Sequence, residues 1–179
     1  MTAFKSSISM LSAALVTVSC FHASPSFAIE IENFRAGLDC QSPNNEREYP
    51  GWICFKTETV HITGQGRCTY DEKQEQCTWY GFEFDYKNLA RDEEVSCTSS
   101  SSQIGDIGNP NGVVKRNAVT YQYVLELEPG SGHYYNPQYT LFHNDLTASQ
   151  VIETTSCSVG DKELFQFKFR LLFPEVASK

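Results

Sequence analysis

The sequence lacks the local patterns on which the common catalytic sites are built. It contains no G-x-S-x-G nucleophile turn, no glycine-rich phosphate loop before a helix and no D-x-D-x-D-G calcium loop. Histidine is also scarce, with 4 in 179 residues, so metal sites and acid–base pairs have few candidates. These absences argue against the nucleotide-dependent, calcium-binding and serine-hydrolase classes of protein.

Basic residues are outnumbered as well. The chain has 14 lysines and arginines against 22 aspartates and glutamates, which gives a formal net charge of -8 at pH 7. An acidic protein is repelled by nucleic acid and by anionic membrane surfaces. We therefore predict no nucleic-acid partner, and nothing in the sequence calls for a cofactor.

The longest apolar run lies near the N-terminus, over residues 8–18, and is too short to span a bilayer. It follows one lysine and precedes the small-residue site Ser26-Phe27-Ala28, an order typical of a secretory signal peptide. We predict a signal peptide over residues 1–28, no membrane span, and a periplasmic or secreted protein. The minor alternative is a lipid anchor on Cys20, which lacks the leucine usual three residues upstream of such sites.

Removing the predicted leader leaves 179 − 28 = 151 residues, a length that fits one domain, with an even number of cysteines. In an exported chain an even set predicts a framework of disulfides, although six cysteines allow about fifteen pairings. Proximity along the chain favours two of the pairs, and the third would bridge two buried strand faces. The expected pairs are Cys68 with Cys77, Cys40 with Cys54, and Cys97 with Cys157.

Alternation of apolar and polar residues dominates the rest of the chain. It is clearest over residues 77–86, 119–128 and 165–173, where every second position carries a large apolar or aromatic side chain. About nine short strands follow from this reading, with no amphipathic helix between them. Strands bounded by turn residues, without intervening helices, are typical of sandwiches and barrels.

We therefore predict an all-β fold, a disulfide-stapled antiparallel β-sandwich of the immunoglobulin-like type over residues 29–173, with a barrel as the alternative. A polar tail over residues 174–179 follows. The serine- and glycine-rich segment 99–112 is expected to be a surface loop that connects strands of different sheets. Residues 87–94 have helical composition over about two turns.

Few residues are candidates for catalysis. Glu83 and Asp85 alternate along one strand and are expected to be solvated, and Ser131 precedes His133 in a glycine turn without an acid to orient the histidine. His133 and His143 would be only two metal ligands, too few for zinc. We predict no metal site and no catalytic residue, and keep as the alternative a small secreted hydrolase that gathers these carboxylates or histidines in a cleft.

Aromatic residues make up 13% of the chain, and four of them are not assigned to the core by the alternation: Trp52, Trp79, Tyr134 and Tyr135. Tryptophan and tyrosine on hairpins or loop tips are favoured contact residues in binding sites. We expect a monomeric, non-enzymatic binding or inhibitor-type protein that recognises an extracytoplasmic protein or glycan through these residues. A surface or structural subunit, the third hypothesis, predicts an exposed strand edge that self-associates.

Overall fold

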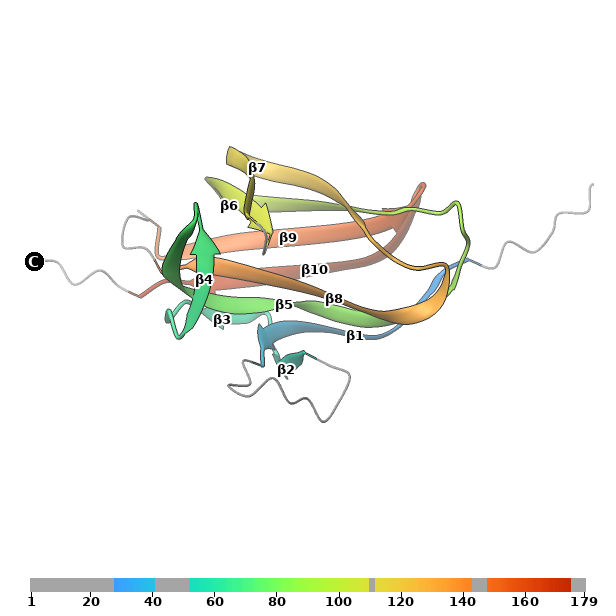
Figure 1. Ribbon diagram of the computed structural model, residues 1–179, viewed down its shortest axis with the longest axis horizontal. Coiled ribbons are helices and arrows are strands. Elements are labelled where there is room, and N and C mark those ends of the chain that lie inside the picture. Colours follow the sequence, from blue (N-terminus) through green and yellow to red (C-terminus); the bar gives the residue numbers. More distant parts are fainter. Residues whose placement is uncertain (1–27, 41–51, 110–111, 143–147, 175–179) are drawn as a thin grey trace, which may run out of the picture.

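The computed structural model describes residues 28–40, 52–109, 112–142 and 148–174, which form ten strands in two five-stranded sheets (Figure 1). The first sheet contains β2 (Ile53–Lys56), β1 (Glu30–Asp39), β5 (Lys73–Leu89), β4 (Gly66–Tyr70) and β8 (Gly130–Leu141). The second contains β3 (Thr59–His61), β10 (Lys162–Leu172), β9 (Gln150–Val159), β6 (Val95–Asn109) and β7 (Gly112–Leu125). The all-β prediction is confirmed for these ranges, which hold no helix able to cross a membrane.

Strand β5 organises the first sheet because it is long enough to pair with three other strands. Its 17 residues pair with β8 along one edge, and with β4 and then β1 along the other. The alternation seen in the sequence turns Tyr80, Phe82, Phe84 and Tyr86 toward the second sheet, where all four are buried. The outer face of the same strand carries Trp79, Gly81, Glu83 and Asp85.

The hydrophobic core lies between β1 and β5 on one side and β9 and β10 on the other. Phe82, Phe84 and Phe169 have at most 1% of their surface exposed. Partly buried Phe165 and Phe167 pack against them, with ring centroids 4.9 Å apart for Phe82 and Phe167. Because each fully buried phenylalanine contributes about 1.5–3 kcal/mol, this aromatic cluster is what holds the two sheets together.

The sheets do not close into a barrel. Within the described residues β8 pairs only with β5, and β7 pairs only with β6. Strand β8 is therefore an edge of the first sheet, and β7 is an edge of the second. The barrel alternative is therefore wrong.

Between β2 and β3 the chain crosses from one sheet to the other through two residues, each of which hydrogen-bonds to a different sheet. The Thr57 N–H donates to the Ala36 carbonyl of β1, and the Glu58 carbonyl accepts from the Arg170 N–H of β10. This short crossing leaves β3 running parallel to β10. A wholly antiparallel arrangement, as predicted, is therefore wrong at this pair of strands.

The segment 99–112, predicted as a surface loop, belongs instead to a β-hairpin. Backbone pairing between β6 and β7 continues to Asn109 and Gly112, although its register is irregular beyond Ser100. Serine and glycine give no apolar face to reveal such strands, and their main-chain hydrogen bonds come from neighbours far along the chain. The loop prediction is wrong, and the change of sheet occurs after β7, where the chain turns into β8 (Figure 1).

Residues 87–94 are not helical. β5 extends through Leu89, and a turn then leads into β6. Lys87 Nζ donates to Glu32 Oε1 at 2.8 Å, and the Asn88 amide donates to Glu30 Oε1 at 3.2 Å, so both side chains bond to β1. Two turns of isolated helix are marginal in water, and pairing with a neighbouring strand outweighs that weak local preference.

The three disulfides are those expected from the sequence: Cys40–Cys54, Cys68–Cys77 and Cys97–Cys157. A set of this size indicates an oxidising, extracytoplasmic environment. Cys97 and Cys157 lie directly opposite each other on β6 and β9 of one sheet, so the idea that they join two facing strand layers is wrong.

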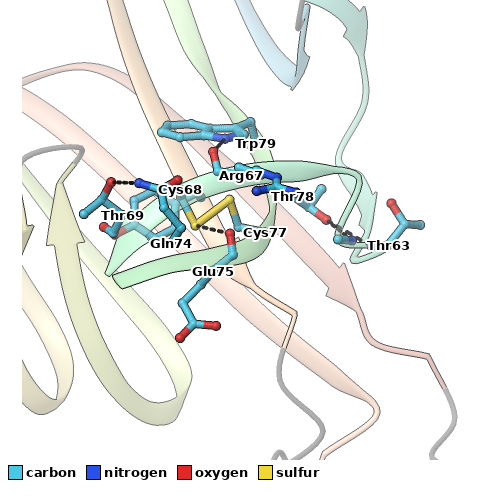
Figure 2. The surroundings of a disulfide bond; sticks show 11 residues. Thr63, Arg67, Cys68, Thr69, Gln74, Glu75, Cys77, Thr78 and Trp79 are labelled. Atoms are coloured by element: carbon cyan, nitrogen blue, oxygen red, sulfur yellow. Dashed lines mark hydrogen bonds between the residues drawn. A yellow bond between two sulfur atoms is a disulfide. The ribbon is translucent and has the colours of Figure 1, made fainter. Parts of the chain in front are cut away.

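The turn before β4 is fixed to β5 by the residue that follows the disulfide of the β4–β5 hairpin, as Figure 2 shows. The buried Thr78 hydroxyl accepts hydrogen bonds from the backbone N–H groups of Thr63 and Gly64, at 3.0 and 3.1 Å. Gly64 has φ +65°, and a Cβ there would lie 2.8 Å from the Phe142 ring. The chain is interrupted at this glycine between β3 and β4, which begins at Gly66.

Candidate functional site

A cleft of about 730 Å³ opens between the two sheets along the second edge of β8. Six consecutive residues of β8, 134–139, form one wall, and residues 99–101 of β6 with Tyr121 and Tyr123 of β7 form the other. Consecutive strand residues point alternately to opposite faces of a sheet. Because residues of both faces of β8 line the cleft, the cleft runs along the edge of this strand rather than under one face of the sheet. Tyr80, Glu153 and Thr155, from strands interior to each sheet, form its base.

The cleft exists because the inner positions that face each other here are polar. Ser99 and Ser101 occupy the inner phase of β6, and Asn136 and Gln138 occupy that of β8, where the other half of the molecule has phenylalanine. Closing the sheets would bury these hydroxyl and amide groups, at a cost of about 1–3 kcal/mol for each one left without a partner. This cost opposes closure of the two sheets over the cleft.

Tyrosine is the dominant side chain of the lining. The rings of Tyr121 and Tyr123 are stacked, with centroids 5.4 Å apart and planes within 13°. Burial raises the pKa of Tyr123 to about 12 and also raises the pKa values of Tyr134 and Tyr139 above 10.0. These phenols therefore remain protonated at neutral pH and can donate hydrogen bonds. The six tyrosines are Tyr80, Tyr121, Tyr123, Tyr134, Tyr135 and Tyr139.

Three side chains form a hydrogen-bonded chain at the base. The Tyr80 hydroxyl donates to Glu153 Oε2 at 2.9 Å and lies 2.9 Å from Thr140 Oγ1. Because the one phenolic hydrogen is directed to Glu153, the Thr140 hydroxyl donates to the Tyr80 oxygen. Burial raises the pKa of the Glu153 carboxyl above its ordinary 4.5 and the pKa of Tyr80 well above 10.0. The base thus holds a carboxyl group that ionises less readily than a solvated one.

An ion-pair network borders one end of the cleft and connects the β4–β5 turn with the β6–β7 hairpin, which approach each other in Figure 1. Arg116 pairs with Asp71 at 2.7 Å and with Asp106 at 2.8 Å, and the Tyr70 hydroxyl donates to Asp106 at 2.7 Å. Exposed pairs of this kind contribute only about 0–1 kcal/mol to stability. They connect the two hairpins at this end of the cleft.

Three of the four aromatic residues predicted to bind a partner lie on the outer face of the first sheet. Trp52 stacks on Tyr135 with centroids 4.9 Å apart and planes within 4°, and Trp79 meets Tyr139 edge-on at 5.1 Å. Tyr134 instead faces inward and packs on the phenylalanine core. Of the four, Tyr134 and Tyr135 belong to the lining of the cleft, while Trp52 and Trp79 do not.

Tyr134 and Tyr135 lie within β8 rather than at the tip of a hairpin. The strand continues through Pro137. The Phe142 N–H donates to the Gln76 carbonyl of β5. Successive backbone N–H groups of a strand point alternately toward and away from the neighbouring strand, so the nitrogen of Pro137, five residues before Phe142, points away from β5. A proline there removes no hydrogen bond of the sheet, so it is compatible with an edge strand and the prediction of a tip is wrong.

Glu83, expected to be solvated, is fully buried on the outer side of the first sheet. Its Oε1 pairs with Arg35 Nη2 at 2.6 Å, and its Oε2 accepts the backbone N–H of Trp52 at 2.6 Å. His133 Nε2 lies 3.5 Å from the same Oε2. The prediction is wrong because a segment 31 residues away along the chain packs over this carboxylate.

Asp85 supplies the acid that the sequence did not reveal beside His133. Its Oδ1 lies 2.8 Å from His133 Nδ1, and the Asn33 amide donates to its Oδ2 at 2.6 Å. Both ring nitrogens of His133 therefore face carboxylates, those of Asp85 and Glu83, and neither is directed to take a proton from Ser131. The cluster is self-contained, and none of its residues lines the cleft.

The contribution of Asp85 to stability is expected to be lost at acid pH. Hydrogen bonds from Asn33 and His133 lower the pKa of Asp85 below its ordinary 3.8, so its carboxylate stabilises the fold above that value and the contribution is lost as pH falls through the lowered pKa. Wild type and Asp85→Asn should therefore differ at neutral pH and converge only as pH falls through the lowered pKa of Asp85. Urea unfolding midpoints measured from acid to neutral pH test this.

Asp92→Asn, in the exposed turn before β6, controls for loss of one surface charge and should retain the wild-type pH profile. An Asp85→Asn difference that stays constant down to the lowest pH would contradict the assignment.

Sequence reasoning assigned Tyr121 and Tyr123 to the core and gave no role to Tyr139 or Glu153. The sequence does contain a sign of the cleft. Along several strands, the positions that point inward change from large apolar residues to serine, threonine, asparagine or glutamine near one end. Alternation alone does not show that those polar ends face one another. The pairing of β6 with β9 and of β5 with β8 brings them together.

Comparison of the chain with protein-family models, curated proteins and solved structures finds no match. Among the described residues, no group of three or more histidine, cysteine, aspartate or glutamate side chains is arranged to hold a metal ion. Any functional conclusion therefore rests on the chemistry of the cleft and of the Glu83–His133 cluster.

Proposed function

We propose that this protein is an exported, non-enzymatic binding protein that holds part of an extracytoplasmic protein or glycan in the tyrosine-lined cleft. The observation that carries this proposal is a cleft of about 730 Å³ lined by six tyrosines, by uncharged polar side chains and by three acidic ones. Ligand sites are typically concavities of several hundred cubic ångströms with aromatic walls and a few orienting polar groups. Three disulfides support export to an oxidising compartment.

The same proposal includes an immunoglobulin-like sandwich. Two layers packed face to face and repeated crossings between the layers support it. The disulfide within one sheet departs from antibody domains, in which the bridge joins the two sheets. The signal peptide over residues 1–28 and the monomeric state stay predictions, and N-terminal sequencing of the exported protein tests the first of them.

The small-hydrolase alternative has one observation in its favour, the convergence of Glu83, Asp85 and His133. These groups bond to one another and to Arg35 at the outer face of the sheet, away from the cleft. His143, the other histidine of that hypothesis, lies outside the described residues. A binding role therefore accounts better for the cavity that the structure contains.

The structural-subunit alternative requires an edge strand that pairs with another chain. The second edge of β8 presents the backbone groups of residues 135, 137 and 139, and at position 137 proline supplies no N–H. Prolines on edge strands are a recognised means of blocking edge-to-edge association. At the edge of β8 we therefore favour ligand binding through the cleft over pairing with a strand of another chain.

Affinity capture tests the binding role. The oxidised, tagged protein from Ile29 to Lys179 is exposed to its native extracytoplasmic extract and is expected to retain one stoichiometric partner. Tyr121→Ala should weaken that retention about 30-fold, because an aromatic anchor of a binding site is worth about 2 kcal/mol. Val119→Ala is the matched control, since Val119 lies on the same strand, is 44% exposed and does not line the cleft.

Equal retention by wild type and Tyr121→Ala would place the partner elsewhere on the surface, and retention of nothing by wild type would contradict the binding role. Chemical cleavage of the captured partner during incubation would instead support the hydrolase alternative.

A further inference from the structure

The charges in the lining limit the ligands that the cleft accepts, an inference that rests on the proposed function. Among the described residues that line it, the ionisable side chains other than tyrosine are Asp106, Glu126 and Glu153, and lysine, arginine and histidine do not occur. An anionic ligand such as an acidic sugar or a phosphate would meet acidic groups without a cation to pair with. The cleft therefore disfavours anions.

Cations are also poorly matched to this lining. Asp106 already pairs with Arg116 at 2.8 Å, and burial raises the pKa of Glu153, which favours its neutral form. Of the acidic side chains in the described lining this leaves Glu126, which is exposed to solvent. An ammonium group needs acceptors only, whereas the walls present many hydroxyl and amide donors. A neutral ligand that both donates and accepts hydrogen bonds fits the cleft better.

The polar groups of the walls match the hydroxyl groups of such a ligand. Serine and threonine hydroxyls both donate and accept, and the amides of Asn136 and Gln138 offer a donor beside an acceptor. The buried Tyr123 hydroxyl lies near Ser99 but makes no hydrogen bond of regular geometry to the described residues. Since buried polar groups are nearly always satisfied, this hydroxyl is positioned to bond to a group that enters the cleft.

The tyrosine rings supply the complementary apolar surface. Tyr121 and Tyr123 are stacked with centroids 5.4 Å apart and ring planes within 13° of each other, so Tyr121 keeps one ring face turned away from Tyr123. An aromatic face carries partial negative charge and attracts C–H groups, which line the flat faces of a pyranose ring. A sugar site needs two features together. An aromatic ring face contacts the C–H groups of the sugar, and neighbouring polar side chains hydrogen-bond to its hydroxyl groups.

We infer that the cleft is a binding site for a neutral saccharide, with the Tyr121 ring against a sugar ring and the Glu153 carboxyl at the base bonding to one of its hydroxyl groups. A volume of about 730 Å³ lies within the usual range for small-molecule sites, so an oligosaccharide of a few units fits.

Binding is tested on an array of neutral oligosaccharides with matched uronic-acid oligosaccharides, together with a trilysine peptide and choline in solution. The oxidised protein from Ile29 to Lys179 is expected to bind at least one neutral glycan, and at least tenfold more tightly than its acidic counterpart. Tyr121→Ala should lose at least tenfold in affinity and Tyr121→Phe less than threefold, because the phenylalanine keeps the ring. Glu153→Gln should weaken binding severalfold, and Val119→Ala should leave it unchanged.

Near-ultraviolet circular dichroism of each variant separates loss of folding from loss of binding. Retention of trilysine or choline, with no neutral glycan bound, would overturn the saccharide assignment in favour of a cationic ligand. Capture of a glycan-free protein that still depends on Tyr121 would overturn it while leaving the proposed binding role intact. If Tyr121→Ala changes neither capture nor glycan binding, both proposals fail together.

Discussion

Replacement of Phe82 by alanine is expected to lower the free energy of unfolding by about 3–5 kcal/mol. Phe82 has 0% of its surface exposed and lies at the centre of β5, where it packs against both sheets. Alanine would leave a cavity bounded by rigid rings, which cannot collapse easily to fill it. The rings around it, with centroids 4.9–6.4 Å away, are Phe34, Phe84, Tyr134, Phe165 and Phe167.

Equilibrium unfolding of the oxidised protein in guanidinium chloride measures this loss. Phe82→Leu keeps most of the apolar volume and should lose less stability than Phe82→Ala. Phe55→Ala is the matched surface control, because Phe55 is 68% exposed on β2 and its removal should change stability by no more than about 0.5 kcal/mol. Equal losses at positions 82 and 55 would show that the core does not lie where the structure places it.

The central position of Phe82 could be predicted from the sequence because alternation along a strand has a single geometric meaning. Residues 80, 82, 84 and 86 must share a face, and in this chain that face is aromatic. The same argument places the phenylalanines of β10 opposite them. Both faces are buried in the structure, as the pattern requires of two layers that cover each other.

The β6–β7 hairpin could not be predicted in the same way, because its residues carry little local information. Ser99, Ser100 and Ser101 have neither an apolar phase nor strong strand preference, and their backbone groups pair with β7 and β9. Thr155, for example, contributes its hydroxyl at 2.7 Å from that of Ser99, across 56 residues of chain. The second wall of the cleft is therefore a product of tertiary pairing.

The candidate site residues also show which features the sequence reveals and which depend on tertiary pairing. Sequence composition selected Tyr134 and Tyr135 as candidate contact residues, but their position in a strand depends on Pro137 lying at an edge. The burial of Glu83 depends on Arg35 and on the segment that carries Trp52, neither of which is adjacent in sequence. Side-chain chemistry is visible in the sequence, whereas the facing of one polar wall toward another is a property of the assembled sheets.

Removal of the Cys97–Cys157 disulfide by a double alanine substitution is expected to cost about 4.3 kcal/mol, from the chain entropy of a loop with a sequence separation of 60. The matched variant, Cys68→Ala with Cys77→Ala, opens a loop with a separation of 9 and should cost about 2.7 kcal/mol. Unfolding curves of both variants, recorded without reductant, give the two values. The reverse order would contradict the argument from loop length.

The two variants should also differ in binding, because only one of the disulfides adjoins the cleft. Ser99 and Thr155 each lie two residues from a cysteine of the Cys97–Cys157 bridge, on the same strands, and their hydroxyls bond to each other at 2.7 Å. Without the bridge this wall is held by fewer constraints, so ligand affinity should fall together with stability. The Cys68–Cys77 variant should keep its affinity at temperatures where it remains folded. Equal loss of affinity in both variants would show that the bridge acts only through global stability and that the wall is not ordered by it.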